Sequence, residues 1–162
     1  MEFEFEPIGI IHTPFTERGD TPVQPAGGAG IQGTVEVFEE YRPALKDLDG
    51  FSHIMLIWVL HRSDGYTLQV VPHRHSEIRG LFATRSPNRP NPIGVSVVRL
   101  DGIEQGLLHI RDVDMLDGSP LLDIKPWVPE FNDGDEIRAG WLEEEGRTGK
   151  GRRSSAGLRR KG

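Results

Sequence analysis

Glycine and proline set the strongest limit on what this 162-residue chain can fold into. The sequence contains 20 glycines and 12 prolines, spread over most of its length. Glycine costs conformational entropy inside helices and strands, and proline removes a backbone N–H donor. Regular elements must therefore be short and often interrupted, which favours strands and turns over long helices.

Several short segments have the alternating or continuously apolar composition that is typical of strands. They are residues 3–12, 33–38, 52–61, 67–71, 78–83, 93–100 and 107–113. Residues 40–48 have helical spacing for one or two turns, and residues 135–145 fit a strand or a short helix. Alternating strand–helix–strand units are absent, so the pattern predicts a mainly β fold, a single antiparallel β-barrel with short helical turns.

Charge is distributed unevenly along the chain. The net charge is −6, but residues 146–162 carry seven basic side chains and no acidic one, which leaves −13 on residues 1–145. We therefore predict a barrel domain over residues 1–145 and a basic, disordered tail over residues 146–162. A solvated terminus and an arm that contacts RNA phosphates both fit this tail.

Composition also excludes several classes of protein. The sequence has no cysteine, which excludes disulfide scaffolds, thiolate metal sites and cysteine nucleophiles. Its longest apolar run, residues 54–60, is far shorter than the roughly 20 residues that span a bilayer. The N-terminus does not read as a secretory signal. We expect a soluble, cytoplasmic protein without membrane contact.

The segment Gly28-Ala-Gly30-Ile-Gln-Gly33 matches the spacing of a dinucleotide-binding loop. That loop requires a strand before its glycines and a helix after them, which together hold a pyrophosphate. Here a proline-containing loop precedes the glycines and a strand pattern follows. We therefore reject a Rossmann site and interpret these glycines as loop backbone.

Two histidines raise the alternative of a metal site. His73 and His75 would lie on one face of an extended segment, with Glu77 or His61 as a third ligand. The spacing is not that of cupin barrels, and Pro72 indicates a loop. We expect no metal, and a cupin-like metalloenzyme is the less favoured reading of this segment.

The most unusual segment is Phe82-Ala-Thr-Arg-Ser-Pro-Asn-Arg-Pro-Asn-Pro-Ile-Gly94. Its three prolines fix φ and order the backbone before any ligand binds. The polar side chains so presented are Arg85, Ser86, Arg89 and Asn91. A hairpin with only a structural role does not need these side chains, so we predict a binding loop.

A second unusual segment runs from Asp112 through the turn Asp117-Gly-Ser-Pro120 to Trp127. It brings together the ionisable residues Asp114, Asp117, Asp123 and Lys125. Ordinary turn chemistry and a functional site explain this segment equally well. Both unusual segments can meet at one rim of the barrel, where loops carry function on a rigid scaffold.

Four segments together resemble the TsaA-like family, the TrmO tRNA methyltransferases. They are Thr21-Pro-Val-Gln24, Gly50-Phe-Ser-His53, the arginine–proline segment 82–94, and Leu116-Asp-Gly-Ser-Pro continuing to Asp-Ile-Lys-Pro126. The resemblance extends over residues 5–142. It implies a β-barrel methyltransferase that uses S-adenosylmethionine without a Rossmann fold.

The resemblance also implies a substrate and an assembly. Family members methylate N6 of threonylcarbamoyladenosine at position 37 of tRNA, in the anticodon loop, and they form homodimers with the cofactor near the subunit contact. Longer members carry an additional C-terminal domain, where this sequence has its basic tail.

The resemblance further assigns residues to the site. Cofactor contacts would fall on Val23, Gln24, Pro25, His61, Arg62, Arg85, Val97, Asp117, Gly118 and Ser119. We predict substrate contacts at Arg89, Asn91 and Lys125, and catalytic roles for Asp114 and Arg85. Since N6 of this nucleoside is a poor nucleophile until its proton leaves, a base is needed, and Asp114, Asp117 and His61 are the candidates.

One further alternative shares the same residues. A barrel that binds tRNA or a nucleotide without turnover would retain the arginines of residues 85–89 and would transfer no methyl group.

Overall fold

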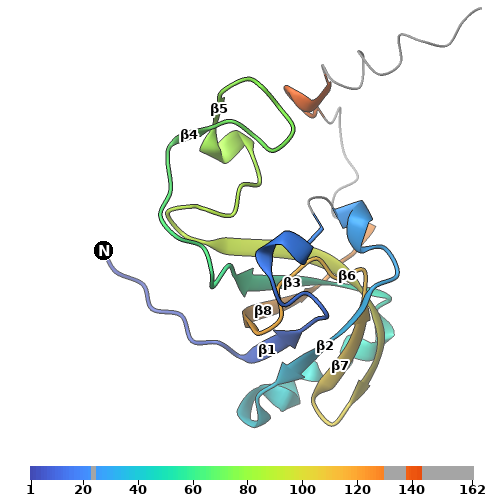
Figure 1. Cartoon of the computed structure of the whole chain (residues 1–162). Coiled ribbons are helices and arrows are strands. Elements are labelled where there is room, and N and C mark those ends of the chain that lie inside the picture. The colour runs from blue at the N-terminus through green and yellow to red at the C-terminus, as the bar shows by residue number, and fades with distance from the viewer. Residues whose placement is uncertain (23–24, 130–137, 144–162) are drawn as a thin grey trace, which may run out of the picture. The chain divides into compact units, whose positions relative to one another are not determined.

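Six antiparallel strands close into a barrel in the computed structural model, which describes residues 1–22, 25–129 and 138–143 (Figure 1). Around the barrel the order is β1 (Gly9–His12), β2 (Gln32–Val37), β7 (Leu107–Arg111), β6 (Ile93–Glu104), β3 (His53–Val59) and β8 (Ser119–Pro126). Strand β8 closes the ring by pairing with β1 and β3. The mainly β, antiparallel barrel predicted from the sequence is confirmed.

Strand β8 is absent from the seven strand segments predicted above. It begins directly after the Asp117-Gly118 turn and contains Pro120 and Pro126, residues that are unusual within strands. Pairing on both sides overrides this poor propensity, since Gly9 lies opposite Leu121 and Ile57 lies opposite Asp123.

Two of the predicted strands lie outside the barrel. Within residues 67–71 and 78–83, only β4 (Gln69–Val70) and β5 (Arg79–Gly80) are extended, and they pair with each other as a separate two-stranded sheet. Residues 3–8 are not part of a strand either. The alternating pattern therefore identified extended segments, but it did not show which sheet each segment joins.

The helical segments in the part of the chain before residue 130 are short 3-10 helices of three to seven residues. They are η1 (Arg18–Asp20), η2 (Pro25–Gly28), η3 (Glu39–Leu45), η4 (Leu48–Gly50) and η5 (Leu81–Ala83). Pro43 lies inside η3 and prevents a regular α-helix there. Among the described residues, no helix is both long and apolar enough to cross a membrane.

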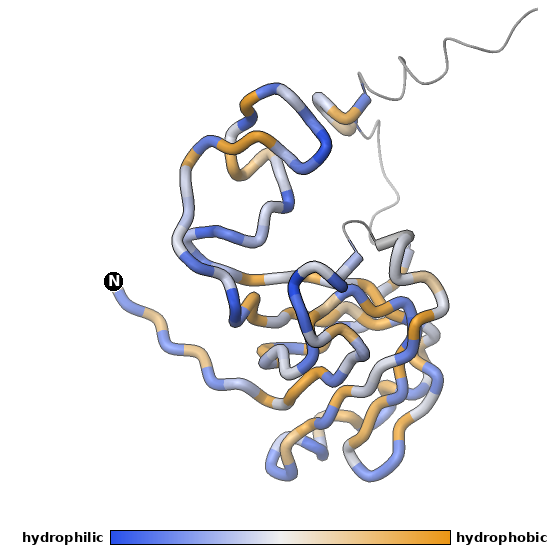
Figure 2. The backbone as a smooth tube through the Cα atoms, viewed as in Figure 1, coloured by the Kyte–Doolittle hydropathy of each residue, from blue (hydrophilic) through white to orange (hydrophobic). Residues whose placement is uncertain are grey.

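The core fills the inside of the barrel. Along each strand alternate side chains point inward, as in β3, where Ile54, Leu56 and Trp58 are buried. Figure 2 shows apolar residues along the barrel strands. Neighbouring strands complete the core with Ile11, Val35, Val37, Val98, Leu100, Leu108, Ile110, Val113, Met115 and Leu121.

Trp58 organises one end of this core. Gly94 lies opposite it on β6, and the absence of a side chain there lets the indole ring lie against the β6 backbone. The indole N–H donates to the Ser96 hydroxyl at 3.1 Å, so the polar edge of this buried ring is satisfied.

The topology directs three connections to the same end of the barrel. β1, β3 and β7 all end there, and β2, β6 and β8 begin there. The connections are residues 13–31, residues 60–92 and residues 112–118, which we call the site rim. At the opposite end lie residues 38–52 and the β6–β7 hairpin.

The chain divides into two compact units, Met1–Val128 and Pro129–Gly162. In the second unit the structure describes residue 129 and residues 138–143, where the Glu143 N–H donates to Gly140 in a helical turn. Residues 146–162 lie outside the described residues, so the division into a domain over 1–145 and a tail over 146–162 stays a prediction.

Replacing Gly94 by alanine should disrupt this core. A Cβ at Gly94 would lie less than 3.0 Å from three atoms of the Trp58 ring. We expect Gly94→Ala to lower the free energy of unfolding by about 1–3 kcal/mol, the usual cost of overpacking, measured by urea denaturation. Gly102→Ala, also on β6, is the matched control, since its Cβ would meet nothing within 4 Å. Equal losses in both variants would contradict this account.

Candidate functional site

The acidic connection 112–118 is held against the end of β1. Backbone N–H groups of Asp117 and Gly118 donate to Phe15 and Ile11 at 2.8 and 2.9 Å. The Asp117 carboxylate accepts the Thr13 N–H at 3.1 Å. Gly118 has a φ of +78°, a conformation that glycine adopts without strain. The turn is therefore fixed in place by hydrogen bonds from two segments of the chain.

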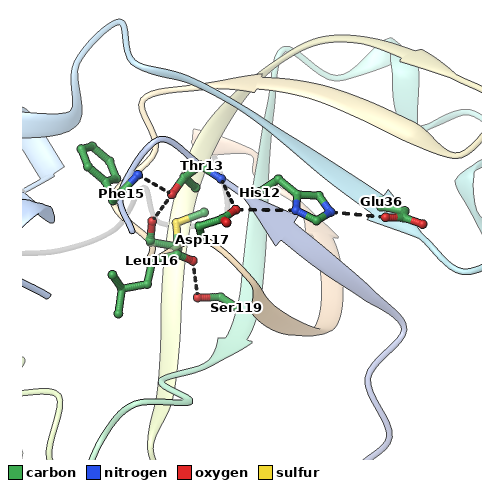
Figure 3. A network of polar contacts seen from close by, with 8 residues as sticks. His12, Thr13, Phe15, Glu36, Leu116, Asp117 and Ser119 are labelled. Carbon is green, nitrogen blue, oxygen red and sulfur yellow. Dashed lines mark hydrogen bonds and ion pairs between the residues drawn. The ribbon is translucent and has the colours of Figure 1, made fainter. Parts of the chain in front are cut away.

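Figure 3 shows the polar network that surrounds this turn. The Ser119 hydroxyl donates to Leu116 O at 2.7 Å and is buried, so this predicted cofactor contact has a structural role inside the turn. His12 lies between two carboxylates, 3.6 Å from Asp117 and 3.3 Å from Glu36. The unpaired lone pairs of Asp117 remain accessible at the rim, because its side chain is about 42% exposed.

The glycine-rich segment packs closely on the acidic connection. A Cβ at Gly28 would collide with the Val113 carbonyl, and one at Gly33 would collide with the His12 carbonyl. The Asp112 carboxylate accepts the Gly30 N–H at 2.7 Å. Gly28 ends the 3-10 turn η2 and Gly33 lies in strand β2, so neither the strand before the glycines nor the helix after them is present, and the rejection of a Rossmann site is confirmed.

The proline-rich connection is closed at its base. The Leu60 N–H donates to Pro92 O at 2.8 Å, and the Ser63 hydroxyl donates to Pro87 O at 2.7 Å. Arg62 links it to the first rim connection, because its guanidinium donates to Thr16 O at 3.1 Å. These bonds hold the two ends of residues 60–92 together beside the barrel.

Arg89 braces the same connection from within. One guanidinium nitrogen donates to the backbone carbonyls of Thr84 and Ser86 at 2.9 and 3.1 Å. The structure therefore gives this residue a role in loop shape, and its contact with substrate stays a prediction.

Asp114 is the rim carboxylate that reaches into the barrel. It accepts the Ser96 hydroxyl at 2.7 Å, and Ser96 in turn accepts the Trp58 N–H. Burial raises the pKa of Asp114 above its ordinary value, while the Ser96 hydrogen bond and the positive charge of Arg85 act in the opposite direction. Arg85 and Asp114, predicted from separate segments, lie on two connections of the same rim.

The rim brings together most of the residues predicted for the site. On its three connections, or directly after them, lie Pro25, His61, Arg62, Arg85, Arg89, Asn91, Asp114, Asp117, Gly118 and Ser119. Val23 and Gln24 lie outside the described residues, in the first connection. The meeting of the arginine–proline and acidic segments was predicted from loop chemistry, whereas Pro25, His61 and Arg62 were assigned from the family resemblance.

Two predicted residues lie elsewhere. Val97 points outward from the middle of β6 and is 40% exposed. Lys125 lies near the far end of β8 and forms an ion pair with Asp123 at 2.8 Å. Neither side chain lies at the site rim.

The site also contains four side chains that the sequence analysis did not predict. Trp58, Ser96, His12 and Thr13 support Asp114 and Asp117. The sequence did contain a signal for Ser96, because this polar residue alternates with the buried apolar residues Val98 and Leu100 on β6. Among the described residues, no group of histidines and carboxylates is arranged to hold a metal, and His73 and His75 form none.

Comparisons with known proteins show the family of this chain. Residues 10–133 match the family model described as the tRNA-methyltransferase O N-terminal domain. The chain belongs to this family. It is 56% identical over 140 residues to a probable S-adenosyl-L-methionine-binding protein of Pyrococcus abyssi, covering 86% of this chain and 76% of that protein.

Other members of the tRNA-methyltransferase O family are longer. The mouse tRNA (adenine(37)-N6)-methyltransferase is 35% identical over 134 residues, which cover 78% of this chain and 31% of that protein. The crystal structure of TrmO from Pseudomonas aeruginosa superposes with a TM-score of 0.73 at 38% identity, covering 86% of this chain and 62% of that one. The chain thus spans less than two thirds of these two relatives.

The pKa of Asp114 predicts how stability changes with pH. Its folded-state pKa is raised, so the wild type loses stability as pH rises above the ordinary value of 3.8. Asp114→Asn removes this loss. The free energy of unfolding of Asp114→Asn, measured by urea denaturation, should therefore increase relative to that of wild type as pH rises from acidic to neutral, so that the variant becomes relatively more stable.

Asp101→Asn is a control for which the change of stability with pH should have the opposite sign. The hydrogen bonds from Arg111 hold the pKa of Asp101 below its ordinary value, so its contribution is lost as pH falls. Relative to wild type, Asp101→Asn should become less stable as pH rises. Parallel curves for the two variants would refute the assignment for Asp114.

Proposed function

We propose that this chain binds S-adenosylmethionine at the site rim and transfers its methyl group to N6 of adenosine 37 in tRNA, with the threonylcarbamoyl nucleoside as substrate. The observation that carries the proposal is that the arginine–proline connection and the acidic connection meet at one rim, where the half-buried Asp114 accepts the Ser96 hydroxyl at 2.7 Å. Membership of the tRNA-methyltransferase O family supports it, as does the cofactor in the relatives' names.

The residues of the rim suit the chemical groups of this cofactor. Asp117 offers carboxylate lone pairs beside Gly118, whose backbone is open on its side-chain face. Arg62 offers a guanidinium group that can bind the cofactor's carboxylate. When bound, the cofactor supplies an activated methyl group on a positively charged sulfur.

Asp114 is placed to accept the proton that N6 must lose. The Asp114 carboxylate would take the proton that N6 loses when it accepts the methyl group, which the bound cofactor would supply. A raised pKa strengthens a carboxylate as a base near neutral pH. Of the three candidate bases, Asp114 is the one that reaches into the barrel and has its pKa raised by burial.

Ser96 and Trp58 position this carboxylate. An indole N–H can only donate, so the Ser96 oxygen accepts from Trp58 and its proton points to Asp114 at 2.7 Å. One carboxylate oxygen is therefore held as an acceptor, and the other takes the incoming proton. Ser96 acts here as a positioning residue.

Arg85 explains a preference for the modified nucleoside. It is exposed at the rim, on backbone stiffened by Pro87, Pro90 and Pro92. A guanidinium there can form a bidentate pair with the carboxylate of the threonyl group. Plain adenosine lacks that carboxylate and would leave Arg85 without this partner.

A homodimer in the cytoplasm completes the proposal. Ile93, Val95 and Val97 point outward from β6 and are 40–52% exposed, which leaves an apolar stripe on the barrel wall. A second copy packed on this stripe would cover it. The same packing would bring Val97 toward the partner's rim, where a cofactor contact from this residue becomes possible.

Arg85→Ala tests the proposal directly. With labelled S-adenosylmethionine and tRNA that carries the threonylcarbamoyl group, we expect kcat/KM to fall about 10- to 100-fold, the cost of a charged hydrogen-bonding contact. The loss should be smaller on tRNA without the group. Lys46→Ala, an exposed residue at the opposite end of the barrel, is the control. Wild-type protein that transfers no methyl group to either tRNA would indicate a binding barrel without turnover.

Ser96→Ala tests the role of Asp114. Without the hydroxyl donor, the pKa of Asp114 should rise further, and the acid limb of the pH–rate profile should move up by about one unit. Ser96→Thr, which retains a hydroxyl, should restore part of the profile. Ser52→Ala at the opposite end should leave it unchanged. An acid limb that stays in place in Ser96→Ala would show that another group is the base.

A further inference from the structure

Positive charge in the first unit is concentrated in one connection, residues 60–92, which we call the excursion. It carries five arginines and two carboxylates, whereas the rest of residues 1–128 carries six basic and sixteen acidic side chains. The arginines are Arg62, Arg74, Arg79, Arg85 and Arg89. Figure 1 shows the excursion with its small β4–β5 sheet beyond the ends of the barrel strands.

The same excursion exposes large apolar side chains. A sheet of two residues per strand has too little surface to bury them, although Leu81 is buried. Figure 2 shows apolar and polar residues alternating along this segment. The exposed residues are Tyr66 at 54%, Leu68 at 67%, Val71 at 54%, Ile78 at 66% and Phe82 at 77%.

Phe82 is the most exposed of them and is also held in place. The Arg89 guanidinium lies 5.8 Å from the centre of its ring. Arg89 is itself fixed by the backbone carbonyls of Thr84 and Ser86. The ring is therefore a preorganised flat surface beside a positive charge, which is what an unpaired nucleobase stacks on.

We propose that the excursion is the surface on which the RNA substrate docks, with Arg74 beside its phosphates and Phe82 and Tyr66 under unpaired bases of the loop. This proposal rests on the proposed function, because it takes an RNA as the substrate.

The charge of the surroundings favours this placement. Glu17, Asp20, Asp112 and Asp117 belong to the other two rim connections. These carboxylates repel phosphates, so an RNA that delivers a base to Asp114 must keep its backbone away from them. The excursion is rooted at this rim by the Leu60–Pro92 hydrogen bond and offers the compensating charge.

A second copy of the chain is the competing occupant of the exposed apolar side chains. In that case Phe82 and Tyr66 would be buried between subunits, and their loss would change the oligomeric state. In the RNA assignment, their loss weakens RNA binding and leaves the oligomeric state unchanged.

The experiment measures binding of the full chain to an anticodon stem-loop RNA by fluorescence anisotropy at several salt concentrations. Phe82→Ala and Tyr66→Ala should each weaken binding about fivefold or more, the value of one stacked base, with the salt dependence unchanged. Arg74→Glu should weaken binding and lower the slope of log K against log salt by about one.

Matched controls lie away from the rim. Phe3→Ala removes a ring that is 74% exposed before β1, and Lys46→Glu makes the same charge change as Arg74→Glu at the opposite end of the barrel. Both should leave RNA affinity unchanged. Cofactor affinity, measured by calorimetry, should be that of wild type in every variant.

The outcomes separate this proposal from the proposed function. Normal RNA affinity in Phe82→Ala, Tyr66→Ala and Arg74→Glu overturns the docking surface, even where the wild type transfers methyl groups. A halved mass by light scattering in these variants, with RNA affinity retained, assigns the excursion to a dimer contact and also overturns it. Weakened RNA binding in a protein that transfers no methyl group supports the docking surface and refutes the proposed function.

Discussion

Closure of the six-stranded ring is the constraint on which the rest of the structure depends. Because neighbouring strands are antiparallel, every second connection emerges at the same end, and residues 13–31, 60–92 and 112–118 must meet there. The ring also fixes which side chains point inward, and so places Trp58 and Ser96 beneath Asp114. The site is a product of topology as much as of its own residues.

Within the rim, similar side chains have different roles. Arg62 and Arg89 donate to backbone carbonyls and hold the loops in shape, whereas Arg85 is exposed and acts on the charge of Asp114. Asp112 and Asp117 accept backbone N–H groups, while Asp114 accepts from a core hydroxyl. Most of the polar groups thus stabilise the geometry in which a few can interact with a ligand.

The sequence allowed the barrel and the convergence of its loops to be predicted, since alternation and proline-rich chemistry are local signals. It did not reveal β8, because turn residues and prolines mask a strand whose stability comes from partners on both sides. It did not reveal the contact of Trp58 with Gly94 and Ser96 either, because register across strands depends on non-local pairing. Val97 and Lys125 were assigned to the site without knowledge of the face on which each lies.

The position of β8 has a consequence for how the chain reaches its native state. The strand that closes the barrel, Ser119–Pro126, is the last of the six to leave the ribosome, and it pairs with the first strand of the barrel. Until it is made, β1 and β3 present open edges to any neighbouring polypeptide. Such late, long-range closure slows folding and leaves nascent chains open to aggregation, which makes this segment a point where chaperones would act.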